Sequence, residues 1–173
     1  MAKIGINGFG RIGRLFYRVA MKSEGFEITA VNDLTDAKTL AHLLKFDSVH
    51  GILNADVSSD QNSFSVNGKK HKVFTIQGLE SLPWRELGVD IVIEASGKFL
   101  SRKDAQKHLD AGAKKVILTA PGKGEKPDVT IVMGVNEKDY NPKRHHVICC
   151  ASCTTNCLAP VAKVLHDNFK IRK

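Results

Sequence analysis

The chain has 173 residues, of which 42% are apolar, 25% charged and 6% aromatic. A chain of this length buries roughly 70% of its unfolded surface, so it can fold without disulfide or metal staples. The composition excludes disordered, collagen-like and disulfide-scaffold proteins. No stretch reaches the roughly 18 apolar residues of a membrane span, and the amino terminus lacks a secretory pattern. We therefore expect a cytoplasmic protein that makes no membrane contact.

The formal net charge of +8 raises nucleic acids and phosphorylated small molecules as partners. The basic residues fall in short, separate clusters, such as 69–72, 114–115 and 143–146. None of these clusters alternates with the aromatic residues on which single-stranded nucleic acids stack their bases. We interpret them as solvated surface and expect no nucleic-acid partner.

The first predicted unit is a strand at 3–7, a helix at 11–22 and a second strand at 26–32. The turn after the first strand contains Gly8-x-Gly10-x-x-Gly13. In this pattern the first glycine allows a tight turn, the second lets a pyrophosphate approach the backbone, and the third lets the helix pack on the strand. The amino terminus of the helix also attracts an anion. The turn therefore predicts a dinucleotide site.

The second strand ends at Asn32 and Asp33, twenty residues after Gly13. A carboxylate at this position accepts hydrogen bonds from the adenosine ribose and repels a 2′-phosphate, which favours NAD over NADP. In the alternative interpretation, Asp33 is an ordinary turn or N-cap residue before a helix predicted at 35–44.

Beyond this helix, polar and apolar residues alternate between 56 and 77 around Asn67-Gly68, a dipeptide typical of a type I′ hairpin turn. Strands are then predicted at 89–95, 115–119, near 129–132 and at 147–150, with a helix at 101–111 and another after Ser152. Nearly continuous apolar strands between amphipathic helices favour a buried parallel sheet. Together with the glycine turn, they predict an α/β, Rossmann-type doubly wound sheet with an antiparallel hairpin insertion.

All four cysteines lie between 149 and 157. Disulfides are disfavoured without a secretory segment. Iron–sulfur ligation is a second possibility, because the spacing of Cys150, Cys153 and Cys157 partly copies a cluster motif that would still need a fourth ligand. In the third interpretation, Ser152 caps the last helix and Cys153 lies in its first turn, where backbone N–H groups stabilise a thiolate.

The third interpretation makes Cys153 a candidate nucleophile and gives the other cysteines a packing role. Cys157 belongs to an apolar stripe of the last helix, and Cys149 and Cys150 belong to the strand before it. No histidine suits the role of base, because His145 and His146 precede that strand and His166 lies far along the helix. The residues alone thus leave a thiol and a cofactor loop without a base.

Four segments carry a resemblance to a known family: 7–14, Asn32-Asp33, 119–121 and 151–160. With them the chain resembles phosphorylating glyceraldehyde-3-phosphate dehydrogenases, and the cysteine decapeptide at 151–160 is the most specific of the four. Family members are about twice as long as this chain. The resemblance implies an NAD-binding Rossmann domain at 1–151, followed at 152–173 by the nucleophile helix that starts a largely absent catalytic domain.

The resemblance also implies roles for single residues. Cys153 would be the catalytic nucleophile and would bind the substrate together with Ser152 and Thr154. The cofactor would be NAD, with no metal, and its contacts would be Asn7, Gly8, Phe9, Gly10, Arg11, Ile12, Gly13, Asn32, Asp33, Ser96, Gly97 and Thr119. In the family reaction, the thiolate adds to D-glyceraldehyde 3-phosphate, hydride passes to NAD, and inorganic phosphate releases the thioester as 1,3-bisphosphoglycerate.

Two departures from the family pattern qualify these roles. Gln77-Gly78-Leu79 stands where many members have a basic residue at the cofactor. The family's histidine base, its phosphate-site Arg and Thr residues and the loop of its homotetramer would all follow Lys173. The resemblance therefore implies a partial enzyme that needs its carboxyl-terminal half for turnover. The alternatives are an isolated NAD-binding module without turnover, with or without nucleic-acid binding, and a cluster-binding redox protein.

Overall fold

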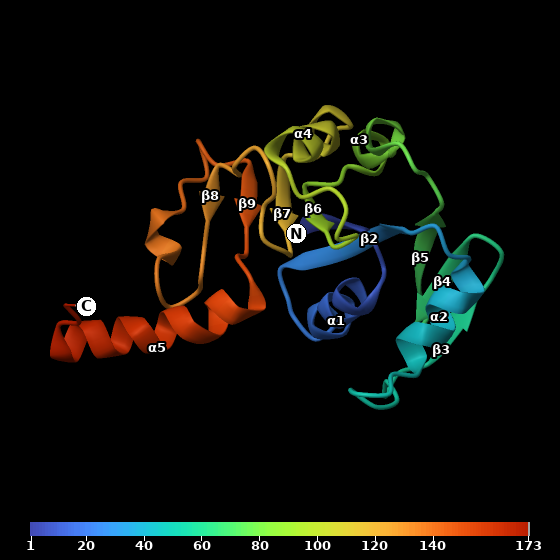
Figure 1. Ribbon diagram of the computed structural model, residues 1–173. Helices are drawn as coiled ribbons and strands as arrows, with labels where there is room; N and C mark the ends of the chain where they lie inside the picture. The colour runs from blue at the N-terminus through green and yellow to red at the C-terminus, as the bar shows by residue number, and fades with distance from the viewer. Residues whose placement is uncertain (173) are drawn as a thin grey trace.

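The computed structural model describes residues 1–172, and within them nine strands form one sheet in the order β3-β4-β5-β2-β1-β6-β7-β9-β8 (Figure 1). The strands from β5 to β8 in this order run parallel, as a doubly wound α/β fold requires. The strand bounds are β1 Ala2–Asn7, β2 Phe26–Asn32, β3 Val57–Ser59, β4 Ser63–Val66, β5 Lys69–Phe74, β6 Ile91–Glu94, β7 Lys115–Leu118, β8 Val129–Thr130 and β9 Val147–Cys149.

The helices cover both faces of the sheet, as Figure 1 shows for α1 on one side and α3 and α4 on the other. One buried cluster joins α1 and α2 to the sheet through Tyr17 and Leu40, and a second joins α3 and α4 through Trp84 and Ala105. The fold class expected from the sequence is therefore confirmed. The helical bounds are α1 Arg11–Ala20, α2 Ala37–Lys45, η1 Leu79–Ser81, α3 Trp84–Leu87, α4 Arg102–Asp110, η2 Glu137–Asp139 and α5 Cys153–Phe169.

The predicted hairpin forms one edge of the sheet. Asn67 and Gly68 have φ angles of 50° and 80°, so the turn between β4 and β5 has the left-handed backbone that this dipeptide favours. β4 pairs antiparallel with β3 and β5, whereas β5 returns to run parallel to β2. The insertion thus extends the central sheet.

Two predicted helix bounds shift, one because of a side-chain cap and one because the last turn tightens. The helix expected from residue 35 begins at Ala37, since the Asp36 carboxylate accepts a hydrogen bond of 2.9 Å from the Thr39 N–H and caps it. The helix expected to reach residue 22 ends at Ala20, where Ser23 N–H bonds to the Ala20 carbonyl three residues back and tightens the last turn.

The apolar stripe of the last helix is exposed, contrary to the prediction that it packs into a core. Helix α5 projects from the body of the sheet, and its carboxyl-terminal end points away from the sheet (Figure 1). Leu158 is 67% exposed and Phe169 is 77% exposed, and none of the residues of α5 is buried. No helix within residues 1–172 has the length and apolar content to cross a bilayer.

Behind the glycine turn, a buried histidine links α1 to β2 and β5. The Tyr17 hydroxyl lies 2.8 Å from His71 Nε2, and His71 Nδ1 lies 3.1 Å from the Ile28 carbonyl. A carbonyl only accepts, so Nδ1 carries the proton and the Tyr17 hydroxyl donates to Nε2. Burial lowers the pKa of His71 from 6.5 to about 4, so the ring is neutral in the folded chain near pH 7.

The depressed pKa of His71 makes stability depend on pH. The unfolded chain takes up this proton as pH falls below about 6.5, whereas the folded chain resists it until about pH 4. The contribution of His71 to the free energy of unfolding is therefore complete well above pH 6.5 and is lost as pH falls toward 4. At pH 5 the loss is about 2 kcal/mol. Urea unfolding at pH 7 and pH 5 measures this loss. In His71→Gln the loss should shrink relative to wild type and to the exposed control His42→Gln; an equal loss in all three would refute the assignment.

Candidate functional site

A cavity of about 500 Å³ opens at the carboxyl ends of β1, β2 and β6. These strands end together because Asn7 is in register with both Asn32 and Glu94. Ligands of doubly wound sheets bind at this edge. Six residues predicted to contact the cofactor line the cavity: Asn7, Gly8, Gly10, Asn32, Asp33 and Ser96.

The three glycines of the turn occupy different environments. Gly8 has a φ of +89°, and a Cβ on it would lie 2.4 Å from Ser96 N. A Cβ on Gly13 would lie 2.2 Å from the Gly8 carbonyl oxygen, so this glycine allows α1 to pack on the turn. A Cβ on Gly10 would meet nothing within 4 Å. Gly10 thus faces open space at the amino terminus of α1, which fits an approaching pyrophosphate.

The Asp33 carboxylate accepts hydrogen bonds that hold the glycine turn in place. Its Oδ2 accepts a hydrogen bond of 2.6 Å from Phe9 N–H, and its Oδ1 accepts one of 3.0 Å from Thr35 N–H. Asp33 is not a helix cap, because Asp36 caps α2. The carboxylate is partly exposed and lines the cavity, so it keeps capacity to accept further hydrogen bonds from a ribose.

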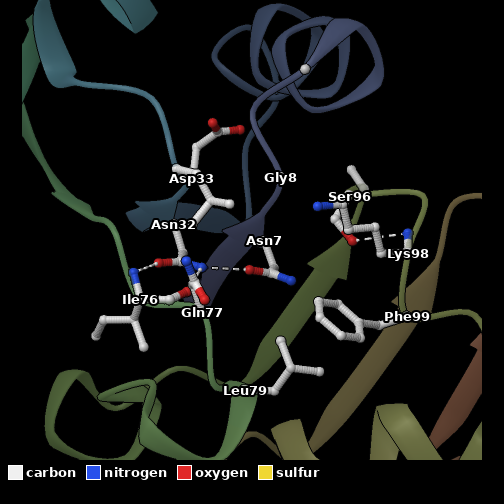
Figure 2. Close-up of a pocket in the computed structure, with 13 residues that line it drawn as sticks. Asn7, Gly8, Asn32, Asp33, Ile76, Gln77, Leu79, Ser96, Lys98 and Phe99 are labelled. Carbon is white, nitrogen blue, oxygen red and sulfur yellow. Dashed lines mark hydrogen bonds between the residues drawn. The ribbon is translucent and has the colours of Figure 1, made fainter.

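A chain of amides forms the floor of the cavity (Figure 2). Ile76 N–H donates to Asn32 Oδ1 at 2.9 Å, and Asn32 Nδ2 donates to Asn7 Oδ1 at 2.8 Å. Figure 2 shows Asp33 on one side of these amides and Leu79 and Phe99 on the other. The two asparagines therefore fix the ends of β1 and β2 relative to each other.

The remaining predicted cofactor contacts lie outside the cavity lining. The Phe9 side chain is fully buried against Tyr17 and Phe64, so only its backbone faces the turn. Gly13 is buried under the turn. Thr119 is tied to β6, with Oγ1 donating to the Glu94 carbonyl at 3.0 Å. The others belong to the first turn of α1 or adjoin Ser96: Arg11, Ile12 and Gly97.

Sequence reasoning missed about half of the cavity lining, which includes most of its apolar residues. Leu34, Ile76, Ala95, Lys98 and Phe99 line the cavity, together with Leu79 and the Gln77 noted as a departure from the family pattern. These residues lie in the segments that follow β2, β5 and β6, and Leu79 is the first residue of η1. The ends of the predicted strands were the available signal, because loops that follow parallel strands gather at one edge.

Cys153 is the first residue of α5 and is exposed. Ser152 caps the helix as predicted, its Oγ accepting a hydrogen bond of 3.0 Å from Thr155 N–H. The hydroxyl oxygens of the two chain neighbours of Cys153, Ser152 and Thr154, are 2.8 Å apart. The backbone that leads from β9 into α5 is strained, because Ala151 has a φ of +60°, in the left-handed region that residues with side chains disfavour.

The other cysteines differ from one another. Cys149 is buried as predicted, and its Sγ lies 3.3 Å from the Ala120 carbonyl. Cys157 is exposed with the rest of α5, so its predicted core role is wrong within residues 1–172. Cys150, also predicted to pack, is exposed, although desolvation around its sulfur raises the pKa of the thiol. Nowhere in the described chain do three such ligands gather as a metal site, so the cluster interpretation has no support in the structure.

Comparison with known proteins supports the reading of the glycine turn. Residues 2–102 match the family described as glyceraldehyde 3-phosphate dehydrogenase, NAD binding domain, and residues 152–173 match the C-terminal domain of the same enzyme. NAD is thus the cofactor of this domain.

Curated relatives match along nearly the whole chain. The glyceraldehyde-3-phosphate dehydrogenase of Geobacillus stearothermophilus is 63% identical over 98% of this chain and 50% of its own length. The glyceraldehyde-3-phosphate dehydrogenase of Thermotoga maritima is 56% identical over 99% of this chain and 51% of its own length. Glyceraldehyde-3-phosphate dehydrogenase 1 of Bacillus cereus is 54% identical over 100% of this chain and 51% of its own length. The chain spans about half the length of the curated relatives it matches.

Proposed function

The chain belongs to the glyceraldehyde-3-phosphate dehydrogenase family, and from that premise we propose that it supplies the NAD site and the nucleophile of a phosphorylating aldehyde dehydrogenase. One observation carries the proposal. Cys153 follows β9, which runs parallel to β7 and β6, so the thiol and the NAD cavity lie at the same edge of one sheet. The division at residues 151 and 152 into a cofactor domain and a nucleophile helix is part of the proposal.

The proposed chemistry begins at Cys153. Its thiolate bonds to the aldehyde carbon of D-glyceraldehyde 3-phosphate, giving a hemithioacetal. Bound NAD supplies the hydride acceptor. After that carbon is oxidised, Cys153 holds the acyl group as a thioester, with Ser152 and Thr154 beside the substrate. An oxygen of inorganic phosphate then attacks, the carbon–sulfur bond breaks, and 1,3-bisphosphoglycerate leaves with the thiolate restored.

A base must remove the hydroxyl proton of the hemithioacetal. His146 and His145 precede β9, at the opposite end of this strand from Cys153. His166 lies about three and a half turns along α5 from Cys153. We therefore assign the base to the part of the relatives that this chain does not span, and with it the phosphate contacts and the homotetramer interface.

The proposed nucleophile predicts unequal thiol reactivity. Cys153 and Cys157 are both exposed on α5, one turn apart, so access is comparable and Cys157 is a matched control. Because only Cys153 lies at the amino terminus of the helix, iodoacetamide should alkylate it about tenfold faster near neutral pH. Peptide mass spectrometry after timed quenching measures both rates. Equal rates would remove Cys153 as an activated nucleophile.

Asp33 should control the choice between NAD and NADP. Asp33→Ala should weaken NAD about tenfold or more, because the ribose acceptor and the brace on Phe9 N–H are lost together. Asp33→Asn keeps an acceptor for one N–H group but loses the charge that repels a 2′-phosphate. Calorimetric titration with both dinucleotides should show reduced discrimination in both variants; unchanged discrimination in both would remove Asp33 from the ribose site.

A further inference from the structure

Glu94, the last residue of β6, is a fully buried carboxylate beneath the NAD cavity. Its Oε2 accepts a hydrogen bond of 2.6 Å from Asn7 Nδ2 and lies 2.9 Å from His108 Nε2. Its Oε1 accepts one of 2.8 Å from Ser96 N–H and another from the Ser96 hydroxyl. Four contacts occupy about the full accepting capacity of a carboxylate.

Two backbone N–H groups, which can only donate, fix the direction of the hydrogen bonds around Asn7 and Glu94. Ser96 N–H is a backbone donor. Ile76 N–H must donate to Asn32 Oδ1, which turns Asn32 Nδ2 toward Asn7 Oδ1 and therefore Asn7 Nδ2 toward Glu94. Glu94 thus receives donors on both oxygens, the arrangement that satisfies the ionised form.

His108 is a neutral partner of Glu94. The Trp84 indole N–H can only donate, and it lies 3.0 Å from His108 Nδ1, so Nδ1 carries a lone pair. His108 Nε2 then carries the single ring proton and donates it to Glu94. The pair is fully buried, and no cation bonds to Glu94 among the described residues. The donors that hold the carboxyl group of Glu94 are therefore all neutral.

Glu94 connects three of the proposed cofactor contacts. Its carboxylate holds the Asn7 amide and the Ser96 loop, both of which line the cavity. Its backbone carbonyl accepts hydrogen bonds from Thr119 N–H at 3.1 Å and from Thr119 Oγ1 at 3.0 Å. One residue thereby joins the carboxyl ends of β1, β6 and β7 at the edge where the cofactor binds.

We propose that Glu94 is a positioning residue of the NAD site, which holds Asn7 and Ser96 in place and whose uncompensated negative charge favours the oxidised, cationic nicotinamide over the reduced, neutral one. This inference rests on the proposed NAD site. The neutral His108 leaves the charge intact, while the surrounding donors hold the carboxylate in a single position.

Two variants of Glu94 separate charge from position. Glu94→Gln keeps the length of the side chain but removes the charge and sets an N–H₂ group against fixed donors. Glu94→Asp keeps the charge but cannot reach Ser96 and Asn7 together. We expect both variants to weaken NAD⁺. In Glu94→Gln the affinity ratio of NAD⁺ to NADH should fall about three- to tenfold, because the variant removes a charge that interacts differently with the cationic and the neutral nicotinamide. In Glu94→Asp the ratio should stay near wild type.

The measurement is calorimetric titration of the full chain with NAD⁺ and with NADH, alongside thermal melting. Glu86→Gln, at an exposed position of α3, controls for the change in net charge and should leave the ratio unchanged. Equal weakening of both dinucleotides by Glu94→Gln would reduce Glu94 to a structural role and overturn the charge effect. Wild-type affinity for both in Glu94→Asp would overturn positioning.

A test without substitution covers the case in which neither variant folds. The unmodified chain should bind NAD⁺ at least as tightly as NADH, because the buried anion favours the cation. Clearly tighter binding of NADH would contradict the charge effect. If the unmodified chain binds neither dinucleotide, the NAD site fails, and that outcome is distinct from a failure at Glu94.

Discussion

Gly13→Ala should lower the free energy of unfolding by about 3 kcal/mol or more. Gly10→Ala should leave the free energy of unfolding within about 1 kcal/mol of wild type but weaken the affinity for NAD at least tenfold. Both changes add one methyl group to the same turn. The predicted effects differ because the first methyl group meets the protein and the second meets the ligand.

The reason lies in the surroundings of each Cα. A Cβ on Gly13 would lie 2.2 Å from the Gly8 carbonyl oxygen, a backbone atom held in place because Gly8 N–H donates to the Asn32 carbonyl at 2.8 Å. Relief would require α1 to move away from β1. A Cβ on Gly10 meets nothing within 4 Å, and the φ of −70° at Gly10 suits alanine. The space it fills is the space a pyrophosphate needs.

Urea unfolding and calorimetric NAD titration of both variants test this division. Gly25→Ala is a useful control for backbone strain alone, because Gly25 has a φ of +94° with nothing within 4 Å of its Cβ position. It should lose some stability and, when folded, keep its NAD affinity. If Gly10→Ala bound NAD as tightly as wild type, the pyrophosphate could not lie over Gly10.

Features governed by neighbouring residues were predictable from the sequence. The strand at 26–32 has the predicted bounds, the Asn67-Gly68 turn has the expected positive φ angles, and Ser152 caps the last helix. Each depends on residues within a few positions of one another, where propensity, turn chemistry and capping act directly. The glycine turn belongs with these, because its strand and helix flank it in the chain.

Features that depend on distant partners were not predictable in the same way. In the sequence, Glu94 is a single charged residue in an otherwise apolar strand. Its partners Asn7 and His108 lie 87 and 14 positions away in the chain. The helical period identified the apolar stripe of α5 correctly but not its surroundings, because nothing within residues 1–172 buries it. Periodicity states which side chains share a face, whereas burial depends on what lies against that face.

Cys153→Ala should abolish turnover in a protein that joins residues 1–173 of this chain to the remaining half of the Geobacillus stearothermophilus relative. That relative is 63% identical across the shared region and supplies the half that this chain does not span. The joined protein should oxidise D-glyceraldehyde 3-phosphate in the presence of NAD and phosphate. Removing the thiol should lower kcat by at least about 10³-fold, because no thioester can form.

Measuring NAD affinity shows whether Cys153→Ala loses turnover because the nucleophile is missing or because the fold is disturbed. Cys153 follows β9 and does not line the cavity, so Cys153→Ala should bind NAD as wild type does. Cys157→Ala, one turn further along the same exposed helix, should retain activity close to wild type. Comparable losses in the two variants would mean that packing of α5 limits the rate. Full activity in Cys153→Ala would exclude the thioester route, whereas full turnover by residues 1–173 alone would contradict the assignment of the base to the other half.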